Sequence, residues 1–478
     1  MSTSNILKQP KPFYVIFSIE MWERFGYYGM QAIMVLYMVK RLGMSDALAF
    51  NTFSAFAAMV YALISIGGFI GDRVLGTKRT ILFGAIVLAF GYYLLGLDRL
   101  NTVFLGLGFI VVGNGLFKAN PSSLLSKCYA ADDYRLDGAF TLYYMAVNIG
   151  SFIGLALVPS VASHYGYRWG FWISSIGLLI AVANYFIFYR WISHVASVAG
   201  KLPLHWGKFL IVLIGTIAGA FLAMWILQHL VVAHYLLLII GIVVAVYFIY
   251  EIIKSSRSER SKLIIALVLM LEAVIFFVLY QQMPTSLNFF AINNMHHDIF
   301  GMSVNPLVFQ SLNPFWILVA SPLLAYFYNR LGLRGKDLSM ASKFTTGMFL
   351  CSISFLVLYL SQYFSDASGL VSSDWIILSY LFQSVGELMV SGLGLAMVAR
   401  FVPQRLMGVL MGAWFMACAA GMMLGGFVAS LTSVPQNLPA VQSLTVYTHT
   451  FLEIGVVTLI ISIVMLAFTP KLNRYINT

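Results

Sequence analysis

The chain contains fourteen apolar stretches, each long enough to cross a lipid bilayer as an α-helix. They cover roughly residues 13–40, 48–72, 79–97, 101–125, 138–163, 169–190, 208–228, 232–252, 262–292, 305–329, 341–363, 375–400, 406–433 and 446–468. Of the 478 residues, 60% are hydrophobic and only 9% are charged, which is unlike a soluble domain of this size. None of the stretches alternates in the manner of an outer-membrane strand. The sequence therefore predicts an all-α polytopic membrane protein.

Positive charges are distributed unevenly between the loops. With the N-terminus placed in the cytoplasm, 22 of the 28 lysines and arginines fall in cytoplasmic segments. Arg24 and Lys118 lie within spans, and the outside segments hold Lys40, Arg41, Arg99 and Arg168. Because Lys and Arg accumulate in cytoplasmic loops, both termini are predicted to be cytoplasmic. The net charge of +11 thus reflects topology and contact with anionic lipid, and we expect no nucleic-acid partner.

The loops are short except for the polar stretch from about Trp191 to Lys208. After this stretch come two very apolar spans and then a charged connector, KSSRSERSK (254–262). We therefore predict an N-terminal six-helix bundle (1–192), a linker with a two-helix insertion (193–260) and a C-terminal six-helix bundle (261–478). The insertion holds no charge at membrane depth, so we expect it to face lipid.

The two bundles resemble each other weakly. Three residues of the first span recur 252 positions later, in the first span of the second bundle: Glu20 with Glu272, Phe25 with Phe277, and Tyr28 with Tyr280. Paired halves with a binding site between them near the membrane midplane are typical of secondary transporters.

Ionisable side chains lie deep in several spans. Glu20, Glu23 and Arg24 share one helical face, which Tyr27 and Tyr28 continue. Each such charge costs about 2.5–3.5 kcal/mol at the bilayer centre, so this face must border protein or a wet cavity. The other charged groups deep in the spans are Lys118, Glu272 and Glu387.

These charges suggest a route from movement to protonation. Burial raises the pKa of a carboxyl group and a neighbouring cation lowers it, so breaking an ion pair between the halves would raise proton affinity. Any single residue of the set has the alternative role of a static ion pair that fixes helix register. Histidine is the usual proton carrier near neutral pH, but no histidine lies mid-span and His296 and His297 fall in an outer loop. The carboxylates must therefore carry any proton.

Polar and aromatic side chains within the spans are candidates for a binding pocket. The amides of Asn148 and Asn313 can satisfy the polar groups of a ligand, or they can join helices by hydrogen bonds. The aromatic candidates are Tyr61, Tyr280 and Trp414, although an aromatic residue in a span more often packs against its neighbours. Gly150 and Gly154 form a small-xxx-small pair, which predicts close helix packing.

The corner GDRVLGTKRT (71–80) places Asp72 and Arg73 at the cytoplasmic end of the second span. An acid that pairs with bases in only one state of a rocking bundle would latch that state, so we predict a gating role for both residues. The alternative is ordinary interfacial charge.

Energy input from ATP or redox chemistry is not expected. The sequence has no G-x-x-x-x-G-K-[ST] loop, no histidine pair placed to hold haem, and no cysteine-rich motif. Its three cysteines, Cys128, Cys351 and Cys418, are scattered and indicate neither a disulfide framework nor a metal site. We expect a protein that is not an enzyme and needs no cofactor or metal.

The segment EMWERFGYYG (20–29) resembles the first-helix signature of the proton-coupled oligopeptide transporter family, a branch of the major facilitator superfamily. Other segments similar to bacterial members are GDRVLGTKRT, GNGLFKANPSSLL (113–125), DGAFTLYYMAVNIGS (137–151), QMPTSLNFFAINN (282–294), LNPFWI (312–317) and FQSVGELMVSGLGLAMV (382–398). The resemblance covers essentially the whole chain. It implies the major facilitator fold, with twelve core transmembrane helices in two bundles and two inserted helices.

The resemblance also implies roles for matching residues. Proton coupling is implied for Glu20, Glu23, Arg24 and Lys118, and a place in the gating or proton network for Glu272. Arg24 and Lys118 would contact the carboxylate of a peptide, and Glu387, assisted by Asn313, its amino terminus. The residues implied to line the pocket are Tyr28, Tyr61, Asn148 and Trp414.

The hypothesis from the sequence is a monomeric, proton-driven importer of di- and tripeptides that works by alternating access. A clamp of Glu387 facing Arg24 and Lys118 would suit the fixed charges of a short peptide and reject longer ones. The sequence contains no acceptable N-glycosylation sequon, because Asn120, in the one near match, is followed by proline. This absence favours a bacterial inner membrane. The alternatives are the same fold carrying an amino acid, nitrate or a drug, a membrane-bound enzyme or sensor, and a passive channel.

Overall fold

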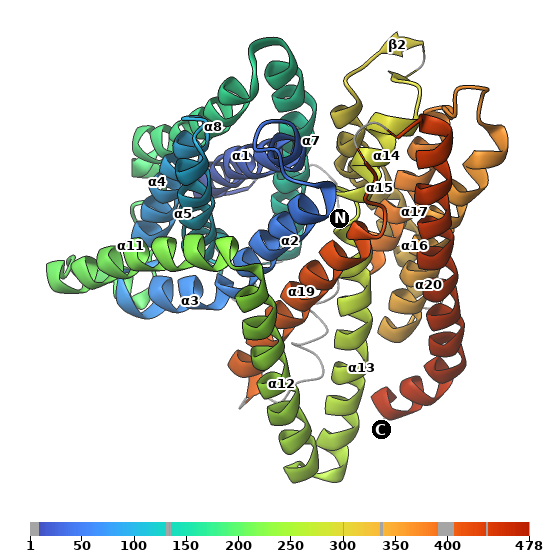
Figure 1. The fold of residues 1–478 in the computed structure, drawn as a ribbon. Helices are drawn as coiled ribbons and strands as arrows, with labels where there is room; N and C mark the ends of the chain where they lie inside the picture. The colour runs from blue at the N-terminus through green and yellow to red at the C-terminus, as the bar shows by residue number, and fades with distance from the viewer. Residues whose placement is uncertain are drawn as a thin grey trace. The chain divides into compact units, whose positions relative to one another are not determined.

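A computed structural model describes residues 9–130, 133, 135–299, 301–334, 338–390, 406–435 and 438–477. Almost all of this part of the chain is helical (Figure 1). The only strands among the described residues are β1 (Asp298–Ile299) and β2 (Met302–Ser303), which pair antiparallel next to Gly301 at a φ of +78°. The predicted all-α class is therefore confirmed.

The long helices follow one another with short connections. In the first half they are α1 (Lys11–Lys40), α2 (Asp46–Ala62), α4 (Thr77–Leu95), α5 (Leu100–Lys118), α7 (Leu136–Tyr165), α8 (Tyr167–Ile187) and α11 (Trp206–Gln228). The second half holds α12 (Leu230–Lys254), α13 (Arg257–Tyr280), α15 (Leu312–Leu333), α16 (Met340–Leu360), α17 (Asp374–Val390), α19 (Met407–Ser430) and α20 (Ala440–Asn477). The short elements are α3 (Ile64–Phe69), the π-helical turn η2 (Ile70–Val74), α6 (Asn120–Ser126), α9 (Tyr189–Ile192), α10 (Val198–Lys201), α14 (Ser286–Asn294), and the 3₁₀ turns η3 (Pro306–Ser311) and η4 (Ser361–Phe364).

Twelve segments of the described chain are long and apolar enough to cross a membrane. Two more helices occupy predicted spans. One is α1, with 30 residues and the central charges; the other is α17, with 17 described residues. The rest of the predicted span 375–400 lies outside the described residues. Together these segments account for the fourteen predicted helices.

Among the described residues, the longest interruption within a predicted span separates α13 from α14. The apolar stretch 262–292 was expected to form a single helix, but α13 ends at Tyr280 and α14 begins at Ser286. Pro284 lies between them. Proline has no backbone N–H to donate and disfavours the helical conformation of the residue before it, here Met283. Hydropathy alone did not indicate this break.

Contacts divide the described chain into two compact units. Unit 1 comprises the described residues up to Tyr37 and from Met59 to Leu230, and unit 2 comprises Met38–Ala58 and the described residues from Val231 onward. Accordingly, α11 belongs to unit 1, where it packs against α5, and α12 belongs to unit 2. The predicted parts 1–192, 193–260 and 261–478 describe bundles along the chain, and they stay a prediction.

Close packing of α1 against α7 organises unit 1. A Cβ atom at Gly150 would lie 2.1 Å from the carbonyl oxygen of Met21, and one at Gly154 would lie 2.5 Å from that of Phe25. Only glycine permits this approach, so the small-xxx-small pair does pack helices as predicted. The approach holds the charged face of α1 against its neighbour.

The same device recurs in unit 2, between α13 and α19. A Cβ atom at Gly421 would lie 2.5 Å from the carbonyl oxygen of Val274, and one at Gly425 would lie 2.5 Å from Cβ of Gln281. Helices α1 and α13 open their predicted bundles, and α7 and α19 are the fifth helices. This repeated pairing supports the internal repeat that the sequence indicated weakly.

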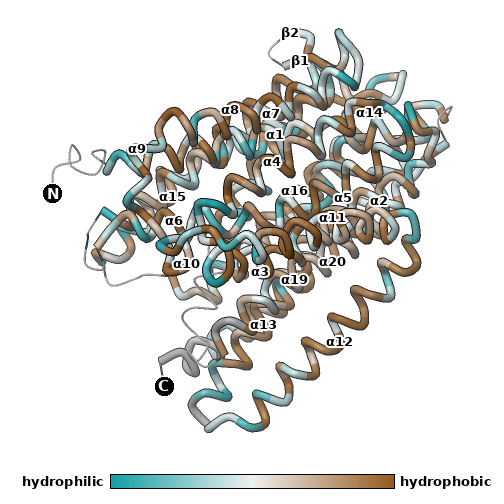
Figure 2. Tube along the Cα trace, turned by 90° about the vertical axis from the view of Figure 1, so that its left-hand side faces the viewer, coloured by the Kyte–Doolittle hydropathy of each residue, from teal (hydrophilic) through white to brown (hydrophobic). Residues whose placement is uncertain are grey.

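The inserted helix α12 carries exposed apolar side chains along its length. Leu238, Ile242 and Val246 are each more than half exposed, and Figure 2 shows α12 hydrophobic over most of its length. A helix that is apolar and unburied within the protein is expected to be covered by lipid. The prediction of a lipid-facing insertion agrees with this surface.

Candidate functional site

The charged face of α1 is buried and internally paired. Glu23 is fully buried, and Glu20 and Arg24 are 3% and 2% exposed. Nε of Arg24 lies 3.1 Å from Oε1 of Glu20 and also contacts Oε2 of Glu23. The helical spacing therefore gathers two carboxylates around one guanidinium, as the sequence predicted. We call these three residues the α1 charge cluster.

Neighbouring helices complete the surroundings of the α1 charge cluster. Asn114, buried on α5, donates from Nδ2 to Oε1 of Glu23 at 3.3 Å. The hydroxyl of Tyr143, on α7, donates a hydrogen bond to Glu20. The centre of the Tyr27 ring lies 5.8 Å from the guanidinium carbon of Arg24. The cluster is thus held by three helices of unit 1.

Lys118 ends α5 one turn beyond Asn114. Its Nζ lies 4.5 Å from the centre of the Tyr61 ring, at a distance typical of a cation–π contact. Lys118 is also within electrostatic reach of Glu23. The predicted basic residue and one predicted pocket aromatic are therefore neighbours in unit 1.

Two other predicted pocket residues of unit 1, Tyr28 and Asn148, make contacts within their own helices. Tyr28 is half-buried on α1, where its ring meets that of Tyr27 edge to face at 5.4 Å. Nδ2 of Asn148 donates to the carbonyl oxygen of Tyr144 at 2.9 Å, within α7. The predicted place of both residues in a binding pocket stays a prediction.

In unit 2, Asn313 and Glu387 form a buried hydrogen-bonded pair. Nδ2 of Asn313, on α15, donates to Oε2 of Glu387, on α17, at 2.8 Å. Nδ2 also contacts Oγ of Ser384 at 3.1 Å, and Oγ of Ser384 donates to the backbone oxygen of Asn313 at 3.2 Å. Glu387 is 7% exposed and Asn313 8%. The neutral amide of Asn313 therefore orients the carboxylate of Glu387 but contributes no positive charge to balance it.

Glu272 is buried on α13, and neither of its carboxylate oxygens has a hydrogen-bond partner in the described part of the chain. A buried ionised carboxylate without a partner is costly. Tyr280, on the same helix, packs its ring against Phe276 and Phe277, at 6.2 and 6.1 Å between ring centres. Trp414 is buried on α19.

Asp72 and Arg73 lie on the π-helical turn η2. Such turns are rare and frequently occur at functional sites. Oδ1 of Asp72 lies 3.0 Å from Nζ of Lys127, which also contacts Oγ of Ser123 at 2.8 Å. Arg73 is exposed. Asp72 therefore pairs with a base across the corner, whereas the predicted gating role stays a prediction.

The described residues contain no group of three or more His, Cys, Asp or Glu side chains that could hold a metal ion. None of the three cysteines forms a disulfide in the described part of the chain. The expectation that no cofactor is needed stays a prediction.

Comparison with known proteins gives the family. The model of the POT family matches residues 78–448. The chain belongs to the POT family. It is 52% identical to "Dipeptide and tripeptide permease B" of Salmonella typhimurium (strain LT2), over 99% of this chain and 98% of that protein. It is 53% identical to the protein of the same name from Aliivibrio fischeri (strain MJ11), over 99% and 97%.

A solved structure described as tetrameric PepTSo2 is 37% identical, with a TM-score of 0.88 over 97% of this chain and 99% of that one. Membership of the POT family confirms the resemblance seen in the sequence and the major facilitator fold. The family consists of transporters rather than enzymes. The chain is accordingly a multi-pass membrane transporter.

For this POT-family chain, sequence reasoning overlooked three partners: Asn114, Tyr143 and Ser384. Each lies in a segment that carried the family resemblance. Asn114 stands one turn before Lys118 on the same helical face, and this spacing was a signal that could have been used. The predicted clamp draws on residues of both units and stays a prediction.

Proposed function

We propose that this POT-family protein imports di- and tripeptides together with protons by alternating access. The full-length relatives named above are dipeptide and tripeptide permeases. The observation that carries the coupling is the α1 charge cluster, in which buried Glu20 and Glu23 both contact Arg24.

In the proposed coupling step, a proton binds to Glu20 or Glu23 and removes one of the two negative charges that hold Arg24. The guanidinium then becomes available to the carboxylate of a peptide. Proton and peptide thereby favour the same conformation, which is what coupling between two ligands requires. Release of the peptide into the cytoplasm lets Arg24 return to both acids and expel the proton.

In the proposed clamp, the peptide carboxylate binds Arg24 and Lys118, and the peptide ammonium binds Glu387. The hydrogen bond from Asn313 supports this by orienting the Glu387 carboxylate. Tyr28, Tyr61, Asn148, Tyr280 and Trp414 complete the proposed pocket. A clamp for two termini depends little on side chains, so the substrate range is expected to be broad.

One proton suffices energetically. A charge that crosses about 100 mV supplies roughly 2.3 kcal/mol, and a pH difference of one unit supplies about 1.4 kcal/mol more. Together they support roughly several-hundred-fold accumulation of a neutral peptide.

The decisive test is uptake of a labelled dipeptide into proteoliposomes with an acid-outside gradient. We expect the gradient to stimulate uptake and a protonophore to abolish the stimulation. Glu23→Gln should lose gradient-driven uptake while retaining part of the exchange of peptide for peptide. Driven uptake that survives in this variant would exclude Glu23 as the coupling acid.

The same assay separates the other solutes. Competition by di- and tripeptides, but not by amino acids or tetrapeptides, supports the clamp. A carrier of nitrate needs only the cationic side, so its transport would be insensitive to Glu387→Ala. We also propose an inner-membrane location with cytoplasmic termini, and a functional monomer. Because PepTSo2 is described as tetrameric, the oligomeric state of this protein has to be measured separately from transport.

A further inference from the structure

The linker that follows α9 is built onto the corner between α3 and α4. Ser197 is 3% exposed, and its Oγ accepts the backbone N–H of Thr77 at 3.1 Å. The hydroxyl contacts the backbone oxygen of Gly71 at 3.3 Å. At Gly76 the φ is +94°, and a Cβ atom there would lie 2.5 Å from Cα of Gly200. The linker is thus packed against this corner and hydrogen-bonded to it.

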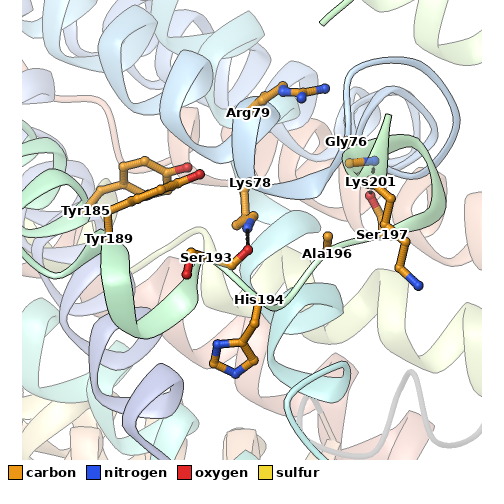
Figure 3. Close-up of a pocket in the computed structure, with 11 residues that line it drawn as sticks. Gly76, Lys78, Arg79, Tyr185, Tyr189, Ser193, His194, Ala196, Ser197 and Lys201 are labelled. Atoms are coloured by element: carbon orange, nitrogen blue, oxygen red, sulfur yellow. Dashed lines mark hydrogen bonds between the residues drawn. The ribbon is translucent and has the colours of Figure 1, made fainter. Parts of the chain in front are cut away.

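Between the linker and the corner lies a cavity of about 330 Å³ (Figure 3). Its lining includes Lys78, Arg79, His194 and Lys201, and none of the described residues that line it is acidic. Figure 3 shows Lys78 in the middle of the lining, directed at Ser193. The cavity therefore concentrates positive charge without a carboxylate to balance it.

The two basic residues of α4 keep their charge available. Nζ of Lys78 donates to the backbone oxygens of Ile192 and Ser193 at 3.0 and 2.7 Å, which uses two of its three donors. A guanidinium N–H of Arg79 donates to the backbone oxygen of Leu202 at 2.8 Å. Within the described chain, Lys78 and Arg79 form no ion pair with an acid. Their uncompensated charges invite an anion.

The cavity lies at the ends of two spans, α4 and α8, and beside the linker that leads to a third, α11. Helix α4 begins at Thr77, α8 ends at Ile187 and α11 begins at Trp206. Tyr189, a lining residue, is 45% exposed, and Trp206 is 73% exposed. Tyrosine and tryptophan are enriched at the membrane–water interface. The cavity is therefore at the depth of lipid headgroups.

Exposed apolar side chains lie on α8 and α11, the spans that precede and follow the linker that lines the cavity. Phe186 and Ile187, at the end of α8, are 59% and 69% exposed, and Leu210 and Ile211, near the start of α11, are 54% and 72% exposed. A ligand with a phosphate head and acyl chains would satisfy both surfaces at once. A free phosphate ion would leave the apolar surface unused.

We propose that this cavity binds the headgroup of an anionic phospholipid. The phosphate lies at the third donor of Lys78 and the hydroxyl of Tyr189, Lys201 adds positive charge on the opposite side of the lining (Figure 3), and the acyl chains follow the exposed ends of α8 and α11. Basic pockets at the ends of membrane helices bind acidic headgroups in this way. A bound lipid would hold the linker to the corner that carries Asp72 and Arg73.

The test measures binding of phosphatidylglycerol and phosphatidylcholine to the purified full-length protein in detergent, by native mass spectrometry and by thermal stabilisation. The wild type should retain phosphatidylglycerol and be stabilised by it more than by phosphatidylcholine. Lys201→Gln should weaken phosphatidylglycerol binding about fivefold, the effect of one surface lysine on an anionic lipid. Lys201→Arg should restore it.

Lys254→Gln is the matched control, because it also removes one exposed positive charge at the end of a span but lies outside the cavity. It should bind phosphatidylglycerol as the wild type does. Lys201→Gln should have the wild-type melting temperature without lipid, since its side chain is exposed. A folded Lys201→Gln variant that binds as tightly as the wild type would overturn the proposal. Equal loss in Lys201→Gln and Lys254→Gln would overturn it as well, and so would full competition by millimolar inorganic phosphate.

Discussion

Asn114 on α5 donates a hydrogen bond to Oε1 of Glu23 on α1 at 3.3 Å, and Arg24 contacts the other oxygen of the same carboxylate. A buried amide and a buried cation therefore share one acid. The amide supports the ionised form, because a hydrogen bond to a charged group is worth about 1.5–3 kcal/mol. Asn114 is thus a positioning residue for the proposed coupling acid.

Replacing Asn114 by leucine should reduce gradient-driven dipeptide uptake by about tenfold and shift its pH dependence towards higher pH, because the ionised carboxylate loses a donor. The measurement is the uptake rate in proteoliposomes across a series of external pH values. Asn184→Leu is the control, since Asn184 also donates to α1, to Oγ of Ser18 at 2.7 Å, away from the carboxylates. An unchanged pH profile in Asn114→Leu would remove the positioning role.

Glu272→Gln should fold with a melting temperature at least as high as that of the wild type, because an amide of the same shape replaces a buried acid without a partner. If Glu272 belongs to the proton network, driven uptake should fall by about tenfold or more, as loss of a positioned proton carrier costs at least that much. Glu453→Gln is the control on an exposed side chain of α20. Wild-type uptake in Glu272→Gln would contradict the predicted role.

Glu387→Gln should raise the dipeptide concentration for half-maximal uptake by about tenfold or more, because it removes the charge proposed to bind the peptide ammonium. An N-acetylated dipeptide lacks that ammonium, so its weak competition should be nearly the same in wild type and variant. The measurement is competition against one labelled dipeptide. If both peptides lose affinity equally, Glu387 does not read the amino terminus.

Gly150→Ala should destabilise unit 1 by about 1–3 kcal/mol, since the added methyl group would meet a backbone oxygen of α1 that cannot move aside easily. The melting temperature in detergent should fall by several degrees. Gly215→Ala is the matched control, because a Cβ atom at Gly215 on α11 has nothing within 4 Å. Equal melting temperatures for the two variants would show that the α1–α7 approach relaxes without cost.

Asp366 orders the loop before α17. The hydroxyl of Ser368 and the N–H of Leu370 donate to its carboxylate and lower its pKa to about 2. The pKa of Asp366 is lower in the folded protein than the value of about 3.9 in the unfolded chain. The ionised carboxylate therefore stabilises the loop fully above a pH of about 3.9, and this stabilisation is lost as the pH falls towards 2. Asp366→Asn should therefore speed amide exchange at Leu370 at pH 6, with a much smaller difference from wild type near pH 2. If the difference in amide exchange between Asp366→Asn and the wild type does not depend on pH, the shape of the Asp366 side chain orders the loop, and its charge does not.

The sequence by itself determined the helices, the membrane class and the ionisable residues of the site. Hydropathy and helical spacing are local properties, so fourteen spans and the shared face of Glu20, Glu23 and Arg24 could be read directly. The family signature at 20–29 then indicated the transporter class.

Only the tertiary structure decided which side chains meet. Asn114 and Glu23 are 91 residues apart, and Asn313 and Glu387 are 74 apart. Such pairs depend on which helices pack together. The spacing of Gly150 and Gly154 predicted a close approach, but only the structure showed that α1 makes it. The break after Tyr280 and the packing of the linker at Ser197 likewise arise from backbone geometry and long-range hydrogen bonds rather than from hydropathy.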